Sequence, residues 1–164
     1  MEKLFVFEKV PENLQELKGL AEASLDSPYK TAALSLLALY NFDKDKEAAF
    51  EMLEFLKGPG GLNTMEKQFL QDRLRGKQYK IRSFFQGAKP ENNYQPSLPL
   101  RLSVGDNANS FTNENWANLY VSSGGADSPR PIQLREKPST GQWFLVELHC
   151  LSDIRLPVDE DPWA

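Results

Sequence analysis

The chain has 164 residues, of which 40% are hydrophobic and 26% are charged, a composition that allows one ordinary hydrophobic core. Its net charge of −4 disfavours general binding of nucleic acid, because such binding requires a basic surface. The single cysteine, Cys150, excludes an intrachain disulfide and a cysteine-based metal site. No apolar run approaches the roughly 20 residues that span a bilayer, so a cytoplasmic protein is expected, or an envelope-associated one if a leader has been removed.

The first half of the sequence, residues 1–86, predicts a layer of about four helices. Residues 4–7 form a short apolar run that is either a strand or an arm docked on the body. Helices are expected to begin at Pro11 and at Ser27-Pro28, because proline suits the first helical turn and serine can cap it. Residues 31–40 are apolar on nearly every side, so the second helix should be the buried centre of this layer.

Two more helices are predicted between residues 43 and 76. Asp43 can cap the third helix, which Gly58-Pro59-Gly60-Gly61 ends. Asn63 and Glu66 have the spacing of a capping box at the start of the fourth helix. Its expected inward stripe consists of Met65, Phe69, Leu70 and Leu74.

Residues 97–156 predict a four-stranded antiparallel sheet, because apolar and polar residues alternate there with a period of two. The expected strands are Leu100–Val104, Ala117–Ser123, Pro131–Glu136 and Gln142–Cys150. In the last strand, Phe144, Val146 and Leu148 should face the core, and Trp143 and Leu145 should lie on the solvated face.

The turns at residues 124–128 and 138–141 are short, so strands two to four should form an antiparallel meander. Helices come first and strands second, which predicts an α+β fold in one domain. Residues 157–164 read as an acidic tail, and its Trp163 is expected to dock on this protein, or otherwise on a partner. The Asn-rich segment 105–115 is a long loop, either functional or mobile.

Charge is most uneven from Arg73 to Lys89, where no acidic residue interrupts the basic ones and aromatic residues interleave. One interpretation is a phosphate or nucleic-acid patch, since arginine pairs with phosphate and aromatic rings stack on bases. The other is a solvated helix end that pairs with the acidic tail. Asp127 to Arg130 likewise forms either an ordinary turn or a binding loop.

His149 is the only histidine and would be the proton carrier of an enzyme. Neighbouring residues of a strand point to opposite faces, so a dyad with Cys150 is geometrically poor. The sequence also lacks the Gly-x-Ser-x-Gly, His-Glu-x-x-His and Gly-x-Gly-x-x-Gly motifs. We therefore assign no catalytic residue, cofactor or metal.

Several stretches resemble an uncharacterised family of bacterial proteins, a domain of unknown function found mainly in low-GC Gram-positive gut bacteria. The similar stretches are FLQDRLRGK (69–77), RSFFQGA (82–88), PENNY (90–94), SGGADSPRP (123–131), QWFL (142–145), DIR (153–155) and EDPWA (160–164). The resemblance covers most of the chain and implies no activity or substrate. It does imply that the three loops among these stretches are candidate binding surfaces.

The leading hypothesis is a non-enzymatic binding or protein-interaction module. Its candidate surface consists of Arg73, Arg82, Tyr94, Asp127, Arg130, Trp143 and His149. The alternative is an enzyme or receptor for a small anionic or phosphorylated ligand held by Arg73, Arg82 or Arg130, with His149 or Asp127 as proton carrier. A weaker third possibility is nucleic-acid binding through residues 73–82.

Overall fold

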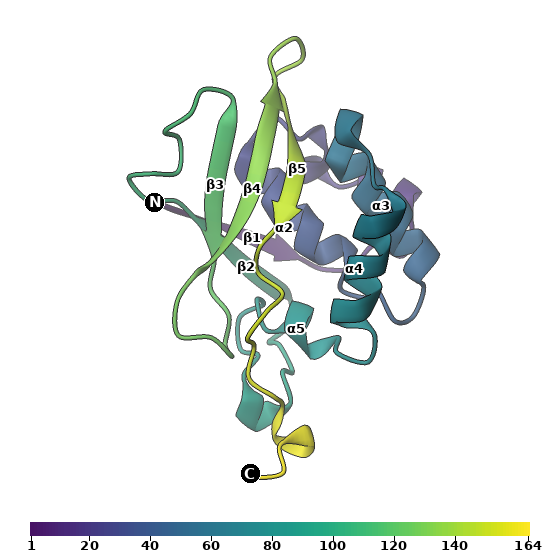
Figure 1. The fold of residues 1–164 in the computed structure, drawn as a ribbon, viewed down its shortest axis with the longest axis vertical. Coiled ribbons are helices and arrows are strands. Elements are labelled where there is room, and N and C mark those ends of the chain that lie inside the picture. Colours follow the sequence, from purple (N-terminus) through teal and green to yellow (C-terminus); the bar gives the residue numbers. More distant parts are fainter.

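A five-stranded antiparallel sheet forms one layer of the protein, whose computed structural model describes residues 1–164 (Figure 1). The strands lie side by side in their order along the chain. They are β1 (Glu2–Phe7), β2 (Leu100–Gly105), β3 (Trp116–Val121), β4 (Arg130–Lys137) and β5 (Gln142–Leu148). The α+β class and the meander of the last three strands are confirmed, and the number of strands is corrected from four to five.

The additional strand is β1, the apolar run near the N-terminus. The sequence alone leaves open whether this run is a strand or an arm docked on the body. It pairs with β2 along its whole length. Phe5 and Phe7 pack into the core, whereas Leu4 and Val6 are 54% and 46% exposed. Local sequence does not decide this pairing, because the partner strand begins only at Leu100.

Five helices form the second layer. They are α1 (Leu14–Lys18), α2 (Pro28–Ala38), α3 (Lys46–Lys57), α4 (Thr64–Leu74) and α5 (Tyr79–Arg82). The prediction of about four helices is corrected, because α1 ends early at Gly19 and the short α5 follows α4. None of these helices has the length and apolar character needed to cross a bilayer.

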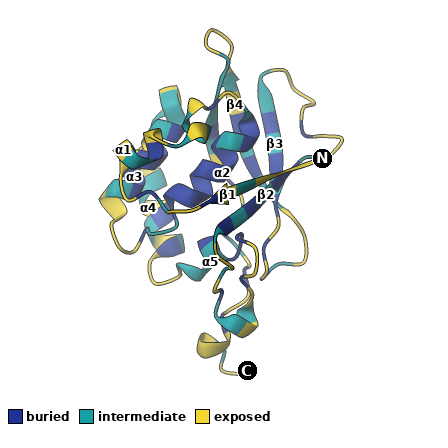
Figure 2. Cartoon of the chain, turned by 180° about the vertical axis from the view of Figure 1, so that it is seen from behind, coloured by how far each residue is buried: buried dark blue, intermediate teal, exposed yellow.

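Helix α2 is the buried centre of the helical layer, as its sequence predicts. Every residue of α2 except Lys30 is buried (Figure 2), and the helix packs against β2, β3, β4 and β5. The Ser27 side chain caps its start by accepting a hydrogen bond from the Tyr29 N–H at 3.2 Å. A helix without a polar face is stable here because it is covered on all sides.

The caps of α3 and α4 confirm one prediction and correct another. Asn63 and Glu66 form the predicted capping box at the start of α4. The cap of α3 is Asp45 instead of Asp43, and its carboxylate accepts from the Ala48 N–H at 3.1 Å. Asp43 instead accepts from the Gly76 N–H at 3.1 Å, and so holds the end of α4 against the loop after α2.

The facing of β5 differs from the prediction because the strand contains a bulge. Leu134 and Gln133 of β4 are consecutive, but their partners are Leu145 and Glu147, so Val146 is an extra residue. Before the bulge, Leu145 is buried and pairs with Leu134, and Phe144 shares the opposite face with Arg135. The expectation that Phe144 faces the core and Leu145 faces solvent is therefore wrong.

After the bulge the alternation changes phase. Leu148 pairs with Ile132 and is 9% exposed, and Cys150 is fully buried. Their expected positions in the core are thus correct. An inserted residue reverses the face of every later side chain, which a strict period of two does not predict.

The C-terminal segment runs down from β5 along the loop after α5 (Figure 1). Asn93 holds it by accepting from the Asp159 N–H at 3.0 Å and donating to the Asp159 carboxylate at 2.9 Å. Trp163 does not dock, because 93% of its surface is exposed. The expectation that this indole packs on its own chain is therefore wrong.

Candidate functional site

The largest hollow of the protein lies between β5 and the corner where α3 ends and α4 begins, and we call it the β5 groove. It consists of two adjoining cavities of about 510 and 420 Å³. Lys57, Glu66, Leu145 and Val146 line both cavities, so these four residues form the waist of one continuous groove. A concave site of this size is large enough for several side chains of a ligand.

The larger cavity opens towards the β4–β5 hairpin. Trp116, Arg135 and Phe144 are direct neighbours across β3, β4 and β5, so their side chains share one face of the sheet. The Arg135 guanidinium lies 4.8 Å from the centre of the Trp116 ring, within the range of a cation–π contact. Pro59 and Gly60 form the opposite wall.

The smaller cavity is mostly apolar and follows the face of α4. Its apolar lining consists of Leu53, Leu62, Met65, Phe69, Leu70, Leu145, Val146 and Leu148. Met65 and Phe69 are 82% and 45% exposed, although the sequence predicts both on the inward stripe of α4. Leu70 and Leu74 are buried as predicted. The two exposed side chains rim the groove because no further layer covers this face of α4.

An ion pair between a buried lysine and a partly exposed glutamate forms the waist of the groove. The Lys57 ammonium contacts the Glu66 carboxylate, and it donates a second hydrogen bond to the Val146 carbonyl at 3.0 Å. Only 10% of the Lys57 side chain is exposed. Glu66 also accepts from the Asn63 N–H at 3.2 Å through the capping box. A charge this deeply buried needs such partners, which fix the spacing between α4 and β5.

Gly58 lets the chain turn from α3 into the wall of the groove. Its φ of +58° is a conformation that favours glycine, and it ends α3. The Phe144 ring lies directly against it, so that a Cβ at this position would overlap the ring. The groove wall therefore depends on glycine at this corner.

The outer edge of β5 faces the groove, and only part of its backbone is hydrogen-bonded to other segments. At one end, the Trp143 N–H donates to the Leu25 carbonyl at 2.7 Å, and its carbonyl accepts from the Thr31 hydroxyl at 2.7 Å. By alternation, the backbone of Leu145 also points away from β4. The His149 N–H donates to the Pro131 carbonyl of β4, so the backbone N–H and C=O of Leu148 point away from β4 as well. No segment outside the sheet hydrogen-bonds to the backbone of Leu145 or Leu148.

Four of the sequence-predicted site residues meet at the C-terminal segment. Arg73 and Arg130 meet at Ser152, whose hydroxyl is 3.3 Å from the Arg73 guanidinium and whose carbonyl is 2.6 Å from that of Arg130. Tyr94 and Asp127 meet at Arg155. The Tyr94 hydroxyl donates to its carbonyl at 2.6 Å, and the Asp127 carboxylate accepts from its guanidinium at 3.0 Å.

Burial explains why the Tyr94 phenol stays protonated where it meets Arg155. Its side chain is fully buried and stacks on Tyr79 with ring centres 5.5 Å apart. Burial raises the pKa of the Tyr94 phenol to about 12. The side chain therefore anchors the C-terminal segment as a neutral hydrogen-bond donor.

The remaining three predicted residues lie apart from one another. Arg82 stacks over Tyr40 at 5.5 Å from the ring centre. Trp143 packs against the core beside α2, so the expectation that it lies on the solvated face is wrong. His149 lies 3.5 Å from Glu147, on the exposed side of the chain after β5. The structure thus gathers four of the seven residues and leaves these three separate.

Cys150 and His149 do not form a reactive pair. Cys150 is fully buried, and burial raises the pKa of its thiol to about 12. A thiol with so high a pKa is not a nucleophile at neutral pH. No group of three or more His, Cys, Asp or Glu side chains is placed to hold a metal ion.

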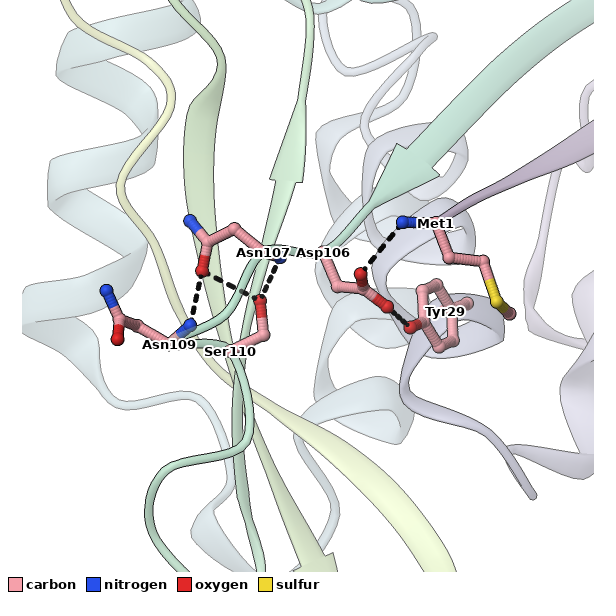
Figure 3. Close-up of polar contacts among 6 residues, drawn as sticks. All are labelled: Met1, Tyr29, Asp106, Asn107, Asn109 and Ser110. Atoms are coloured by element: carbon pink, nitrogen blue, oxygen red, sulfur yellow. Dashed lines mark hydrogen bonds and ion pairs between the residues drawn. The ribbon is translucent and has the colours of Figure 1, made fainter.

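The Asn-rich loop after β2 is ordered by its own side chains (Figure 3). The Asn107 side chain accepts from the Asn109 N–H at 2.8 Å, and the Ser110 hydroxyl accepts from the Asn107 N–H at 2.9 Å. The Asp106 carboxylate accepts from the Tyr29 hydroxyl and lies 3.0 Å from the Met1 amino group. Burial, and secondarily this carboxylate, raises the pKa of Tyr29 to about 12. The loop thereby ties β1 to α2.

Sequence reasoning misses the β5 groove. Lys57 and Glu66 lie on opposite sides of the glycine-rich turn, and neither stands out by residue type. One sequence signal could indicate the ion pair. Glu66, which the capping box already places at the start of α4, lies nine residues after Lys57 at the end of α3. The exposure of Met65 and Phe69 carries no sequence signal, because it depends on which helix face the fold leaves uncovered.

Comparison with known proteins gives one finding on identity. Neither the curated proteins nor the solved structures give a match to this chain. A family model described as a domain of unknown function, DUF6935, matches residues 9–158. These residues contain all five helices, the last four strands and the whole β5 groove. The expected resemblance to a domain-of-unknown-function family is therefore confirmed, and the chain belongs to the DUF6935 family.

Proposed function

We propose that the protein is a non-enzymatic binding module whose β5 groove takes an extended peptide segment of a partner protein. The observation that carries this proposal is that no segment outside the sheet hydrogen-bonds to the backbone of Leu145 or Leu148 at the edge of the groove. An extended peptide can add a strand to such an edge, and main-chain hydrogen bonds then supply affinity. The groove beside the edge supplies space for every second side chain of the added strand.

The lining of the groove suggests the chemistry of the segment. An apolar ligand residue would bury the exposed side chains of Met65 and Phe69 in the smaller cavity. At the hairpin end, Arg135 and Lys137 have no carboxylate within 4.0 Å. An acidic ligand residue at that end would pair with them. The preferred segment therefore combines an apolar residue with an acidic one.

The enzyme hypothesis receives less support. It requires an arginine, a proton carrier and a pocket at one place. Asp127 pairs with Arg155 on the surface, and His149 pairs with Glu147. Arg82 stacks over Tyr40, and neither Arg73 nor Arg130 makes a hydrogen bond to either proton carrier.

The experiment is a selection of random linear peptides displayed on phage against the intact protein. Enriched peptides are then measured for affinity to two matched variants. Met65→Glu places a charge at the rim of the groove, and Leu98→Glu places the same charge at an equally exposed leucine elsewhere, since both residues are 82% exposed. We expect Met65→Glu to weaken binding at least about tenfold, or about 1.4 kcal/mol, and Leu98→Glu to leave it unchanged.

Two outcomes would overturn the proposal. One is that no peptide is enriched above the background of an unrelated protein. The other is that the enriched peptides bind Met65→Glu and Leu98→Glu equally well, because the binding site would then lie outside the groove.

A further inference from the structure

Six cations that lie in the basic segment and at the start of β4 have no carboxylate within 4.0 Å. They are Arg73, Arg75, Lys77, Lys80, Arg82 and Arg130. The expectation that the basic segment pairs with the acidic tail is therefore not met by any ion pair. In contrast, Lys57 in the groove has its own carboxylate partner.

Three of these cations surround one turn of the C-terminal segment, and we call Arg73, Lys80 and Arg130 the Ser152 cluster. Arg130 donates to the carbonyls of Ser152 and Asp153 at 2.6 and 3.1 Å. Arg73 donates to the Ser152 hydroxyl at 3.3 Å. The two guanidinium groups, which come from β4 and from α4, thus meet at one serine.

Lys80 brings a third charge into the same region, where the charges of Arg73 and Asp153 act on its ammonium. Only 8% of its surface is exposed, and its ammonium makes no hydrogen bond or ion pair within the protein. Burial lowers the pKa of Lys80, and the charges of Lys77 and Arg73 lower it further, while Asp153 opposes them. Like charges close to one another disfavour their charged forms unless an anion compensates them.

The cluster also has hydrogen-bond donors to spare. The Nε of Arg130 is buried and has no acceptor. A guanidinium carries five N–H donors, of which Arg73 uses only one on a protein group. Buried donors without acceptors are rare in folded proteins and call for an explanation.

We propose that the Ser152 cluster is a binding site for a phosphate group. Two arginines present donors in the planar fork that matches phosphate oxygens, and the lysine adds a compact charge. A phosphate dianion would satisfy the spare donors and neutralise more than one of the three charges. The site is separate from the cavities of the β5 groove, but it adjoins their rim, because Arg73 also stacks on Phe69, 5.0 Å from the ring centre.

The test is a titration of the intact protein with inorganic phosphate at constant ionic strength, followed by calorimetry and by NMR of the lysine side chains. We expect a dissociation constant of about 1 mM or tighter. We also expect the pKa of Lys80 to rise when phosphate binds, because the anion favours the charged ammonium. A purely structural cluster would show neither effect.

Matched variants locate the site. Arg73→Gln removes one guanidinium of the cluster, and Arg75→Gln removes an exposed one from the same helix end. We expect phosphate affinity to fall at least about tenfold in Arg73→Gln and to stay unchanged in Arg75→Gln. Met65→Glu should keep its phosphate binding, which separates this test from that of the groove.

A second arm identifies the source of the phosphate. O-phosphoserine within a short unstructured peptide is titrated alongside inorganic phosphate. Tighter binding of the phosphopeptide would support a phosphorylated protein as the source, and tighter binding of inorganic phosphate would support a free ion. Absence of binding by both probes, or an equal loss in Arg73→Gln and Arg75→Gln, would overturn the proposal.

Discussion

At the scale of single residues, neighbouring segments explain why glycine is required at positions 124 and 125 and why Lys57 can be buried. Gly124 and Gly125 lie where three segments meet, and a Cβ on Gly124 would overlap the Ala88 carbonyl oxygen. The sequence indicates a turn there, but the close approach of the segments depends on the tertiary fold. Lys57 in turn can be buried because Glu66 and the Val146 carbonyl receive its charge.

Replacing Gly125 with alanine should destabilise the protein. The new methyl group would overlap the Tyr94 hydroxyl and approach Cγ2 of Ile154 to 2.9 Å, so the C-terminal segment must shift. We expect the free energy of unfolding to fall by about 1–3 kcal/mol in urea denaturation. Gly60→Ala is the control, because no heavy atom lies within 4 Å of its added Cβ. Equal stability of the two variants would contradict the packing described for Gly125.

At the scale of elements, sequence patterns predict what depends on neighbours in the chain. Helix α2 is correctly predicted as buried because it lacks a polar face, and the capping box of α4 because its two residues are three apart. The sequence pattern does not predict which side chains of β5 face the core, because the bulge at Val146 depends on pairing with β4. The exposure of Met65 and Phe69 is missed for a related reason, since it depends on which elements pack against α4.

The capping box of α4 can be tested directly. Asn63→Ala removes the oxygen that accepts from the Glu66 N–H at 2.8 Å. We expect a loss of about 1 kcal/mol in the free energy of unfolding, measured by chemical denaturation. The side chain of Asn109 makes no hydrogen bond, so Asn109→Ala should have almost no effect. If Asn63→Ala were as stable as Asn109→Ala, the cap would not hold the helix start.

At the scale of the whole molecule, the two edges of the sheet differ. The edge at β5 is partly closed by Leu25, Thr31 and Lys57, whereas no segment beyond β2 and its following loop bonds to the backbone of β1. Exposed edges are sites where other chains add strands. The sequence predicts most of the strands that form this sheet, but the pairing of β1 is long-range and is settled only by the fold.

Stability of the whole molecule should decline at alkaline pH. Burial raises the pKa of Cys150, Tyr29 and Tyr94 to about 12, from ordinary values of 9.0 for the thiol and 10.0 for the phenols. The folded state therefore retains protons that the unfolded state releases, and stability falls as the pH rises from about 9 to about 12. Below about pH 9 this contribution is fully present.

Urea denaturation at a series of pH values measures this effect. Cys150→Ala removes the group with the lowest ordinary pKa, so we expect it to flatten the decline between about pH 9 and pH 10. A free energy of unfolding that stays constant up to about pH 12 would show that these three groups are not buried as described.

The central claim is that an extended segment adds to the part of the β5 edge at Leu145 and Leu148 that bonds to no other segment, and amide hydrogen exchange with a selected peptide tests it most directly. Binding should slow exchange at the N–H groups of Leu145 and Leu148, because the added strand supplies acceptors to outward-facing donors. Exchange at Leu4 and Val6 of β1, on the other edge of the sheet, should not change. Slower exchange at Leu4 and Val6 with none at Leu145 and Leu148 would contradict the account, because the partner would then bind the opposite edge.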